Sequence, residues 1–240
     1  MVNGFYNGVA GLRVAELTQE LAANNLANLE TAGFKAERGF VAALDLALDG
    51  GPGAQPHVAG TGLSMTAGPV RLTGRPLDVA IDGAALLAVE TAAGERYTRD
   101  GRLQVAGDGT LRTASGHAVL GTTGPLVVTG TDVRVEDDGT VVADGVEAGR
   151  LKLVEPPPGG DLRPEGHGLL ASPAPLAAID EAAGRVRAGY VESSNVDPVG
   201  GTVTLVETLR RFESLARANE LLMGELTKSL FEESGRPLGR

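Results

Sequence analysis

Apolar residues recur at helical spacing close to the start of the chain. One face of the predicted helix carries Ala10, Val14, Leu17 and Leu21. Their spacings of four, three and four residues follow the helical period. Thr31-Ala32-Gly33 is typical of a helix end, because glycine takes the left-handed conformation without strain. We predict an N-terminal helical segment over residues 1–48, broken near Gly33 and helical again over 40–48.

The middle of the chain has a different pattern, in which short apolar runs alternate with glycine-bearing turns. The runs lie at 70–72, 77–81, 86–89, 127–128, 133–135, 141–142 and 151–154. Asp-Gly pairs, which favour tight turns and hairpins, occur at 82–83, 100–101, 108–109 and 138–139. Strands at this spacing without intervening helices predict an all-β middle domain over residues 52–176.

The C-terminal part returns to a helical pattern, from about residue 199 to residue 231. One heptad row contains Leu205, Phe212, Asn219 and Leu226, and a second contains Leu209, Ala216, Met223 and Leu230. Rows sustained over almost four heptads are typical of a helix that packs against another helix. Asn219 is then expected to be a buried amide, which specifies register and partner at some cost in stability. A helix packed on the middle domain of its own chain is the alternative.

Together these patterns predict an α+β fold. N- and C-terminal helices form a coiled-coil-like stem, and the all-β middle domain is inserted between them. The C-terminal helical segment spans residues 189–232 and includes the turn-rich sequence before the helix. Neither terminal segment buries its apolar stripe alone, so the other terminal helix or another subunit is expected to cover it. The pattern therefore indicates a protein that assembles.

Composition and charge narrow the classes of partner. Lys and Arg number 21 against 31 Asp and Glu, and the resulting net charge of −10 disfavours binding to nucleic acid or to an anionic membrane surface. The start of the chain lacks a basic region followed by an apolar run, so we expect no cleaved signal peptide. No stretch approaches the ~20 apolar residues of a membrane span, so we expect no membrane insertion.

Candidate catalytic and metal-binding groups are few. The three histidines, His57, His117 and His167, lack the spacing of metal ligands, and there is no cysteine. Glu136-Asp137-Asp138 precedes a Gly-Thr turn and lacks the calcium-loop pattern, so a solvated hairpin tip is expected. We therefore predict that the protein is not an enzyme and has no cofactor and no catalytic, cofactor-binding or metal site.

Three segments resemble motifs of the flagellar basal-body rod and hook protein family, in the family's order. Residues 23–35, ANNLANLETAGFK, match the family's N-terminal signature without a gap. Residues 73–83 and 96–101, continuing through 109–111 to 116–121, are similar to its middle domain. Residues 189–197, GYVESSNVD, are similar to its C-terminal signature.

The resemblance implies a structural subunit of the flagellar rod. Such a subunit is exported through the flagellar type III apparatus without signal cleavage, and it polymerises through its terminal helices in the basal body. Other rod and hook-basal body subunits are the implied partners. The chain is most similar to the proximal rod protein, F type, at Asp78 and at residues 149–154 and 210–213. The distal rod protein, G type, is the alternative. A binding module in the β-domain, or a hook-basal body relative with a non-rod role, is the alternative function.

Pattern and resemblance together assign side chains to an assembly interface. These are Asn24, Asn25, Asn28, Thr31, Gly33, Phe34, Asn195, Leu205, Leu209, Phe212, Asn219, Met223 and Leu226. Each asparagine amide offers two donors and an acceptor for contacts between subunits. Alternatively, the first three asparagines end the first helix through hydrogen bonds to nearby backbone, and Phe34 closes that helix end within its own subunit.

Overall fold

The computed structural model describes residues 2–44, 55–156, 161–179 and 186–234, and side chains are described for all of these except 2–7, 41–44, 55–59, 226 and 229–234. The chain divides into two compact units. Unit 1 consists of residues 1–26, 37–61 and 198–240, and unit 2 of residues 27–36 and 62–197. Helices and strands occur together, which confirms the predicted α+β class.

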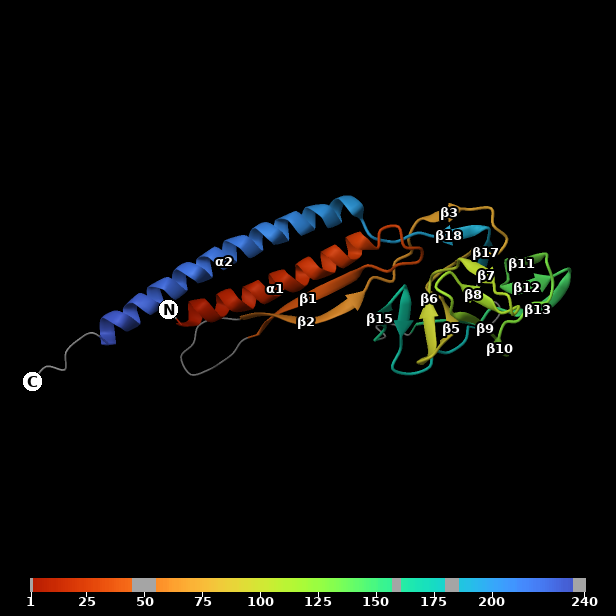
Figure 1. Ribbon diagram of the computed structural model, residues 1–240, viewed down its shortest axis with the longest axis horizontal. Helices are drawn as coiled ribbons and strands as arrows, with labels where there is room; N and C mark the ends of the chain where they lie inside the picture. Colours follow the sequence, from red (N-terminus) through yellow and green to blue (C-terminus); the bar gives the residue numbers. More distant parts are fainter. Residues whose placement is uncertain (1, 45–54, 157–160, 180–185, 235–240) are drawn as a thin grey trace, which may run out of the picture. The chain divides into compact units, whose positions relative to one another are not determined.

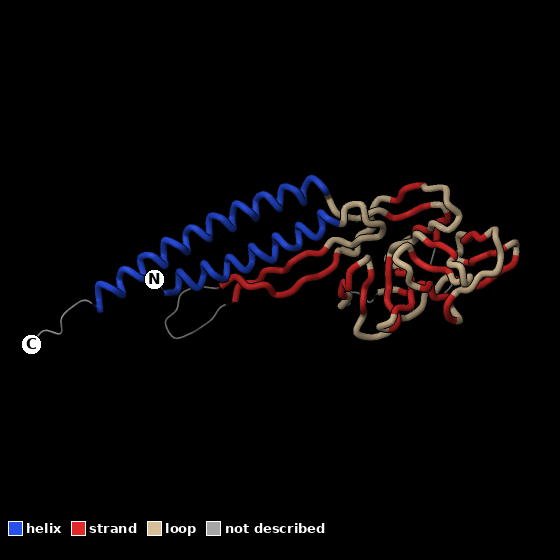
Figure 2. Tube along the Cα trace, viewed as in Figure 1, coloured by secondary structure: helices blue, strands red, loops and turns tan. Residues whose placement is uncertain are grey.

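Unit 1 contains two helices and a two-stranded sheet: α1 (Val2–Ala27), α2 (Pro198–Ser234), β1 (Glu37–Leu44) and β2 (Gln55–Leu63). The two helices run antiparallel side by side, because Gly8 and Gly11 of α1 lie against Asn219 and Leu215 of α2 in that order (Figure 1). The sheet follows the other side of α1, where Leu21 lies against Gly39 (Figure 2). The long α2 confirms the helix predicted over 199–231, and it begins at a proline, whose fixed φ suits the first helical position.

Small residues form the face of α1 that meets α2. This face carries Gly8, Gly11, Ala15 and Ala22, and both alanines are buried. The larger stripe predicted on α1 lies on a different face, since its last member, Leu21, lies against β1. The two terminal stripes therefore do not pack on each other as the sequence suggested. Instead, the glycines of α1 leave room for the side chains of Leu215 and Asn219 on α2.

The second heptad row predicted on α2 is wrong for packing within the chain at Leu209 and Met223. Between residues 205 and 222, the buried and half-buried positions are Leu205, Thr208, Phe212, Leu215, Ala216, Asn219 and Leu222. The row of Leu205, Phe212 and Asn219 is kept, whereas Leu209 and Met223 are 39% and 48% exposed. The other row lies one residue earlier and includes Thr208, whose hydroxyl donates to the carbonyl of Thr204 at 2.7 Å and so tolerates burial. The side chains of Leu226 and Leu230 lie outside the described residues.

The prediction of a second helical stretch over 40–48 is also wrong. Residues 37–44 form β1, which pairs with β2, and residues 45–48 lie outside the described part of the chain. A short apolar run such as 40–44 fits either a helix or a strand by periodicity alone. The pairing partner, which the local sequence does not reveal, decides between them.

Unit 2 is built from short antiparallel strands. They are β3 (Val70–Leu72), β4 (Val79–Ile81), β5 (Leu86–Thr91), β6 (Gly94–Thr98), β7 (Leu103–Val105), β8 (Leu111–Thr113), β9 (Ala118–Gly121), β10 (Gly124–Pro125), β11 (Val133–Val135), β12 (Thr140–Ala143), β13 (Val146–Arg150), β14 (Leu153–Val154), β15 (Arg163–Gly166), β16 (Leu169–Ala171), β17 (Val186–Ala188) and β18 (Tyr190–Glu192). The largest sheet has the order β15-β16-β6-β5-β9-β8-β7, with β10 beside β9 and β14 beside β5. The smaller sheets are β11-β12-β13, β17-β4 and β18-β3.

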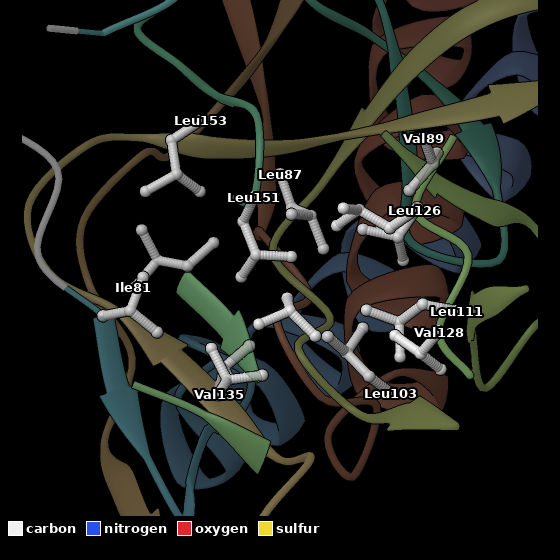
Figure 3. Close-up of a cluster of buried hydrophobic side chains, with 14 of the residues drawn as sticks. Ile81, Leu87, Val89, Leu103, Leu111, Leu126, Val128, Val135, Leu151 and Leu153 are labelled. Atoms are coloured by element: carbon white, nitrogen blue, oxygen red, sulfur yellow. The ribbon is translucent and has the colours of Figure 1, made fainter. Parts of the chain in front are cut away.

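Strand β5 separates two hydrophobic clusters. Leu87 and Val89 point into the larger cluster, which also contains Leu103, Leu111 and Leu151 (Figure 3). Leu86 and Ala88 belong to the smaller cluster, around Tyr97. These four residues of β5 are fully buried, so alternate side chains of the strand enter the two clusters on its opposite faces.

Two of the four predicted Asp-Gly turns connect paired strands. Residues 108–109 join β7 to β8 and residues 138–139 join β11 to β12, with Gly109 and Gly139 at φ 79° and 84°. Residues 82–83 instead lead from β4 to β5, which do not pair with each other, and residues 100–101 are buried. An Asp-Gly pair supplies a turn conformation, but tertiary packing decides which strands meet.

The larger cluster gives a stability prediction. Replacing Leu111, which is fully buried, by alanine is expected to lower the free energy of unfolding of unit 2 by about 2–5 kcal/mol, because it removes apolar contacts and leaves a cavity. Leu72→Ala is the matched control, since Leu72 is 66% exposed in the same unit, and its cost should be within about 0.5 kcal/mol. Urea unfolding followed by circular dichroism measures both, and equal costs would contradict this assignment of the core.

Candidate functional site

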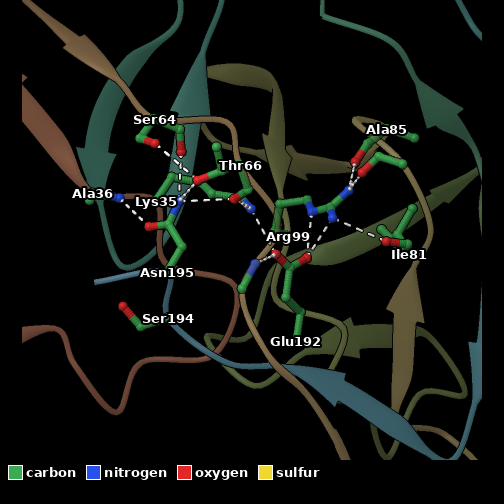
Figure 4. A network of polar contacts seen from close by, with 12 residues as sticks. Lys35, Ala36, Ser64, Thr66, Ile81, Ala85, Arg99, Glu192, Ser194 and Asn195 are labelled. Atoms are coloured by element: carbon green, nitrogen blue, oxygen red, sulfur yellow. Dashed lines mark hydrogen bonds and ion pairs between the residues drawn. The ribbon is translucent and has the colours of Figure 1, made fainter. Parts of the chain in front are cut away.

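The three segments that resemble family motifs meet at one buried ion cluster in unit 2. Lys35 comes from the segment after α1, Arg99 directly follows β6, and Glu192 is the last residue of β18. Their side chains are only 1–2% exposed (Figure 4). We call Gly33, Lys35, Arg99, Glu192 and Asn195 the clasp, because they join segments that are distant in the sequence.

The Glu192 carboxylate is the centre of the clasp. Its Oε1 accepts hydrogen bonds from Lys35 Nζ and from the backbone N–H of Gly68, both at 2.7 Å. Its Oε2 accepts a hydrogen bond from Arg99 Nε at 2.7 Å. Every oxygen of this buried carboxylate is therefore paired, as burial of a charge requires.

The two cations have further acceptors on the backbone. Lys35 Nζ donates to the carbonyl of Thr66 at 2.8 Å. The Arg99 guanidinium donates to the carbonyls of Ile81, Gly83 and Ala85 (Figure 4). Arg99 thus fixes the turn between β4 and β5 in addition to pairing with Glu192.

The charges of the cluster do not balance, since two cations share one carboxylate. Burial lowers the pKa of Lys35 from its ordinary value, the hydrogen bond and the charge of Glu192 oppose this shift, and the neighbouring Arg99 adds to it. Both cations depend on the same anion. Loss of the Glu192 charge would leave two buried positive groups facing each other.

Asn195 forms the second part of the clasp. Its Oδ1 accepts a hydrogen bond from the N–H of Ala36 at 2.7 Å, and its Nδ2 donates to the carbonyls of Ser64 and Thr66 at 2.8 and 2.9 Å. Its own N–H donates to the carbonyl of Phe34 at 3.3 Å. One amide therefore joins the segment after α1, the segment after β2 and the segment before α2.

Gly33 allows the closest approach in the clasp. Its φ is 66°, and its N–H donates to the carbonyl of Glu192 at 2.8 Å. A Cβ at this position would overlap the backbone of Arg99. The left-handed conformation predicted at Gly33 is confirmed, and the absence of a side chain also makes room for the backbone after β6.

The N-terminal signature asparagines have partners in their own chain. In unit 1, Asn25 forms two hydrogen bonds with the backbone of Glu37, both at 2.9 Å, and Asn24 donates to the Glu37 carboxylate at 3.0 Å. Burial raises the pKa of that carboxyl group, and the hydrogen bond from Asn24 opposes the shift. In unit 2, the hydroxyl of Thr31 donates to Oδ1 of Asn28 at 3.1 Å. These contacts agree with the alternative that the asparagines fix the chain path after the first helix.

The remaining predicted interface residues fall into two groups. Leu205 and Phe212 are half-buried and Asn219 is buried on the α1 side of α2, whereas Leu209 and Met223 are exposed. Phe34 is half-buried in unit 2. Contacts of these side chains with other subunits stay a prediction.

Sequence reasoning missed Lys35, Arg99 and Glu192 as a cluster. The available signal was one charged residue beside apolar or small residues in two motifs, as in Phe34-Lys35-Ala36 and Val191-Glu192. Nothing in the local sequence indicates that these charges face one another, because 157 positions separate Lys35 from Glu192.

The acidic run at 136–138 lies at the exposed tip between β11 and β12, as predicted. Hydrogen bonds from the N–H and the hydroxyl of Thr140, together with Arg150, lower the pKa of Asp138. These donors cap the turn.

Of the histidines, His117 is half-buried and His167 exposed, and the side chain of His57 lies outside the described residues. No helix within the described residues has a segment long and apolar enough to cross a membrane.

Comparison with known proteins gives relatives along nearly the whole chain. Residues 80–143 match the model of the flagellar hook protein FlgE/F/G D1 domain. The chain is 32% identical to the flagellar basal-body rod protein FlgF of Caulobacter vibrioides, across 98% of this chain and 99% of the relative. It is 35% identical to FlgF of Escherichia coli K12, across 85% and 92%, and 28% identical to the rod protein FlgG of Bacillus subtilis, across 89% and 92%.

The imbalance of charge in the clasp gives a prediction. Glu192→Gln is expected to lower the free energy of unfolding of unit 2 by about 3–5 kcal/mol, because it leaves Lys35 and Arg99 buried without a counter-charge. Lys35→Met should cost less, about 1–2 kcal/mol, because the Arg99–Glu192 pair remains. Urea unfolding measures both, with the exposed Glu90→Gln as a matched control that changes stability by less than about 0.5 kcal/mol. A larger loss for Lys35→Met than for Glu192→Gln would refute this account.

The close approach of the Arg99 backbone to Gly33 gives another stability prediction. Gly33→Ala is expected to destabilise unit 2 by about 3 kcal/mol, since the added Cβ must displace the backbone of Arg99. Gly74→Ala is the control, because Gly74 also has a positive φ, 73°, but no atom within 4 Å of an added Cβ. It should cost only the conformational penalty, about 1 kcal/mol. Hydrogen exchange of unit 2 amides compares the two variants, and similar losses would mean that φ alone explains Gly33.

Proposed function

Because the chain belongs to the flagellar basal-body rod protein family, and within it to the F type, we propose that it polymerises with other axial subunits through its terminal helices. Family membership gives the chain a structural role in the flagellar rod and places it in the flagellar basal body. The F type predicted from the sequence is confirmed. In this role the protein is a building block of the drive shaft, and no catalytic step is involved.

The exposed surface of α2 carries this proposal. Val203, Val206, Leu209, Leu221 and Met223 are 39–73% exposed. Together with Val199, these are more large apolar side chains than a solvated helix normally exposes, and exposed apolar surface marks interaction sites. We call these five residues the outer surface of α2. Their burial by neighbouring rod subunits would supply the free energy of assembly.

The inner side of α2 supports the second part of the proposal. It packs on α1 in antiparallel orientation through Leu215, Asn219 and the glycines at 8 and 11. We propose that the two helices act together as a coiled-coil-like stem, with the interface residues at Leu205, Phe212 and Asn219 holding the stem. Leu209, Met223 and Leu226 then extend the interface toward other subunits.

The signature residues have a supporting role in the proposed assembly. Asn25 holds the start of β1 against the end of α1, and the clasp joins the first and last segments of unit 2. We propose that Asn24, Asn28, Thr31, Gly33, Phe34 and Asn195 thereby fix the ends of the assembly segments. The segments are residues 1–48 and 189–232, and the β-domain of 52–176 makes lateral or outward contacts.

The proposal includes two partners. Other rod and hook-basal body subunits contact the chain in the finished structure, and the flagellar type III apparatus exports it without cleavage of a signal peptide. A protein that passes through an export channel and folds at its destination needs no disulfide, which agrees with the absence of cysteine. A separate binding function of the β-domain is not favoured, because the comparisons extend over both terminal segments as well.

Deletion of the chain in its own cells tests the rod role. We expect loss of flagellar filaments, with purified basal bodies stalled at an incomplete rod, because later subunits have no surface on which to add. Electron microscopy and swimming assays give the result. Normal flagella, in a strain without a close paralogue, would rule out the rod role.

Complementation of that deletion strain tests the outer surface. Leu209→Glu places a charge on the outer surface and is expected to reduce swimming to that of the deletion strain, because burial of an unpaired charge prevents docking. Ser214→Glu adds the same charge at an exposed polar position of α2 and should restore swimming. Immunoblots confirm that both proteins accumulate. Full rescue by Leu209→Glu would exclude Leu209 from the interface while leaving the rod role intact.

A further inference from the structure

Asn219 is an unusual buried residue. It is 8% exposed, and neither Oδ1 nor Nδ2 of its side chain has a hydrogen-bond partner among the described residues. Among the described residues, the other side chains with buried unpaired atoms, those of Asp78, Glu95 and Arg112, have one such atom each. A buried amide normally makes hydrogen bonds, since each unpaired group loses its interaction with water without compensation. The position of Asn219 in the helix pair therefore requires an explanation.

The residue opposite Asn219 has no side chain. Its amide lies against Gly8 of α1, and a Cβ at position 8 would overlap Oδ1 and approach Cγ and Nδ2. A shift of α1 by one heptad would bring Ala15 to this place, and its methyl group would have to displace the amide. The amide and Gly8 therefore favour the observed alignment of the helices over a shift by one heptad.

The same contact limits the stability of the pair. Gly8 offers no side-chain donor or acceptor, so the alignment that fits the shape of Asn219 leaves its polar atoms unpaired. A leucine of similar size would bury apolar atoms in the same space without this cost. The chain thus places an amide in the helix seam and large apolar side chains, such as Val206 and Leu221, on the outside.

We propose that Gly8 and Asn219 form a register key, which fixes the antiparallel alignment of α1 and α2 and keeps this helix pair weakly stable. Shape complementarity provides the alignment, and the unpaired amide provides the weakness. A weak pair allows both helices to readjust when subunits associate. This last consequence rests on the proposed function, whereas the key itself is a property of the single chain.

Hydrogen exchange on the full-length isolated chain tests the weakness. Asn219→Leu is expected to raise the protection factors of the amides of α1 and α2 by about tenfold or more, because it removes the unpaired amide. Ser214→Leu is the control, since it gives a similar gain in helix propensity at an exposed position of the same helix. It should change protection by less than about threefold. Unchanged or lower protection in Asn219→Leu would overturn the proposed weakness.

A double-mutant cycle tests the alignment. Gly8→Ala should lower the protection of α1 and α2 in the natural sequence, because the new methyl group must displace Asn219. In the Asn219→Ala background the same substitution should raise protection, since the space is free and alanine favours a helix over glycine. This reversal of sign is the expected result. An effect of the same sign and size in both backgrounds would overturn the key.

Complementation of the deletion strain tests the consequence for assembly. Asn219→Leu should swim less than the natural chain although its helix pair is more stable, while Ser214→Leu should swim normally. Equal swimming of both variants would overturn the link between a weak pair and assembly. Failure of the natural chain itself to restore swimming would count against the proposed function, and the two exchange experiments would still decide the key.

Discussion

A single buried carboxylate, that of Glu192, determines which segments of unit 2 come together. It receives Lys35 from the segment after α1, Arg99 from the edge of β6, and the backbone of Gly68. A buried ion pair contributes little net stability, because the loss of hydration offsets the attraction between the charges. Its effect is specificity, since an arrangement that separates these groups leaves charges buried without partners. Arg99 also donates hydrogen bonds to three backbone carbonyl groups, and the Asn195 amide bonds to the segment after β2. These contacts hold the loops around the carboxylate in place as well.

The helix pair of unit 1 buries polar side chains beside Leu205, Phe212 and Leu215, and it leaves other large apolar side chains exposed. Thr208 and Asn219 are buried on α2, whereas Val203, Val206 and Leu221 are exposed. On α1, the face toward α2 consists of glycines and alanines. A helix pair that had to be stable on its own would bury these exposed apolar side chains as well. The proposed assembly would cover them.

The signature sequences of the family have physical roles inside the single chain. Gly33 admits the backbone of Arg99, Asn25 pairs with the backbone of Glu37, and Asn195 joins three segments. Each of these roles depends on the residue type, since only glycine lacks a Cβ and an asparagine amide can donate and accept at once. The signature residues of this chain thus fix the chain path inside the unit to which each belongs. An interface role and an internal role for these residues are compatible, because fixing the chain path also fixes the surface it presents.

The sequence alone determined the elements with strong local signals. The 37-residue α2, the short strands of the middle domain and the left-handed Gly33 follow from periodicity, from β-branched runs and from the conformational freedom of glycine. Tertiary structure decided what local patterns leave open. The run at 40–44 became a strand because β2 pairs with it. Thr208 rather than Leu209 lies in the seam, and the bond of its hydroxyl to its own helix makes this burial tolerable. The ion cluster needed the folded chain most of all, since its charges are far apart in sequence and only the closed backbone excludes water from them.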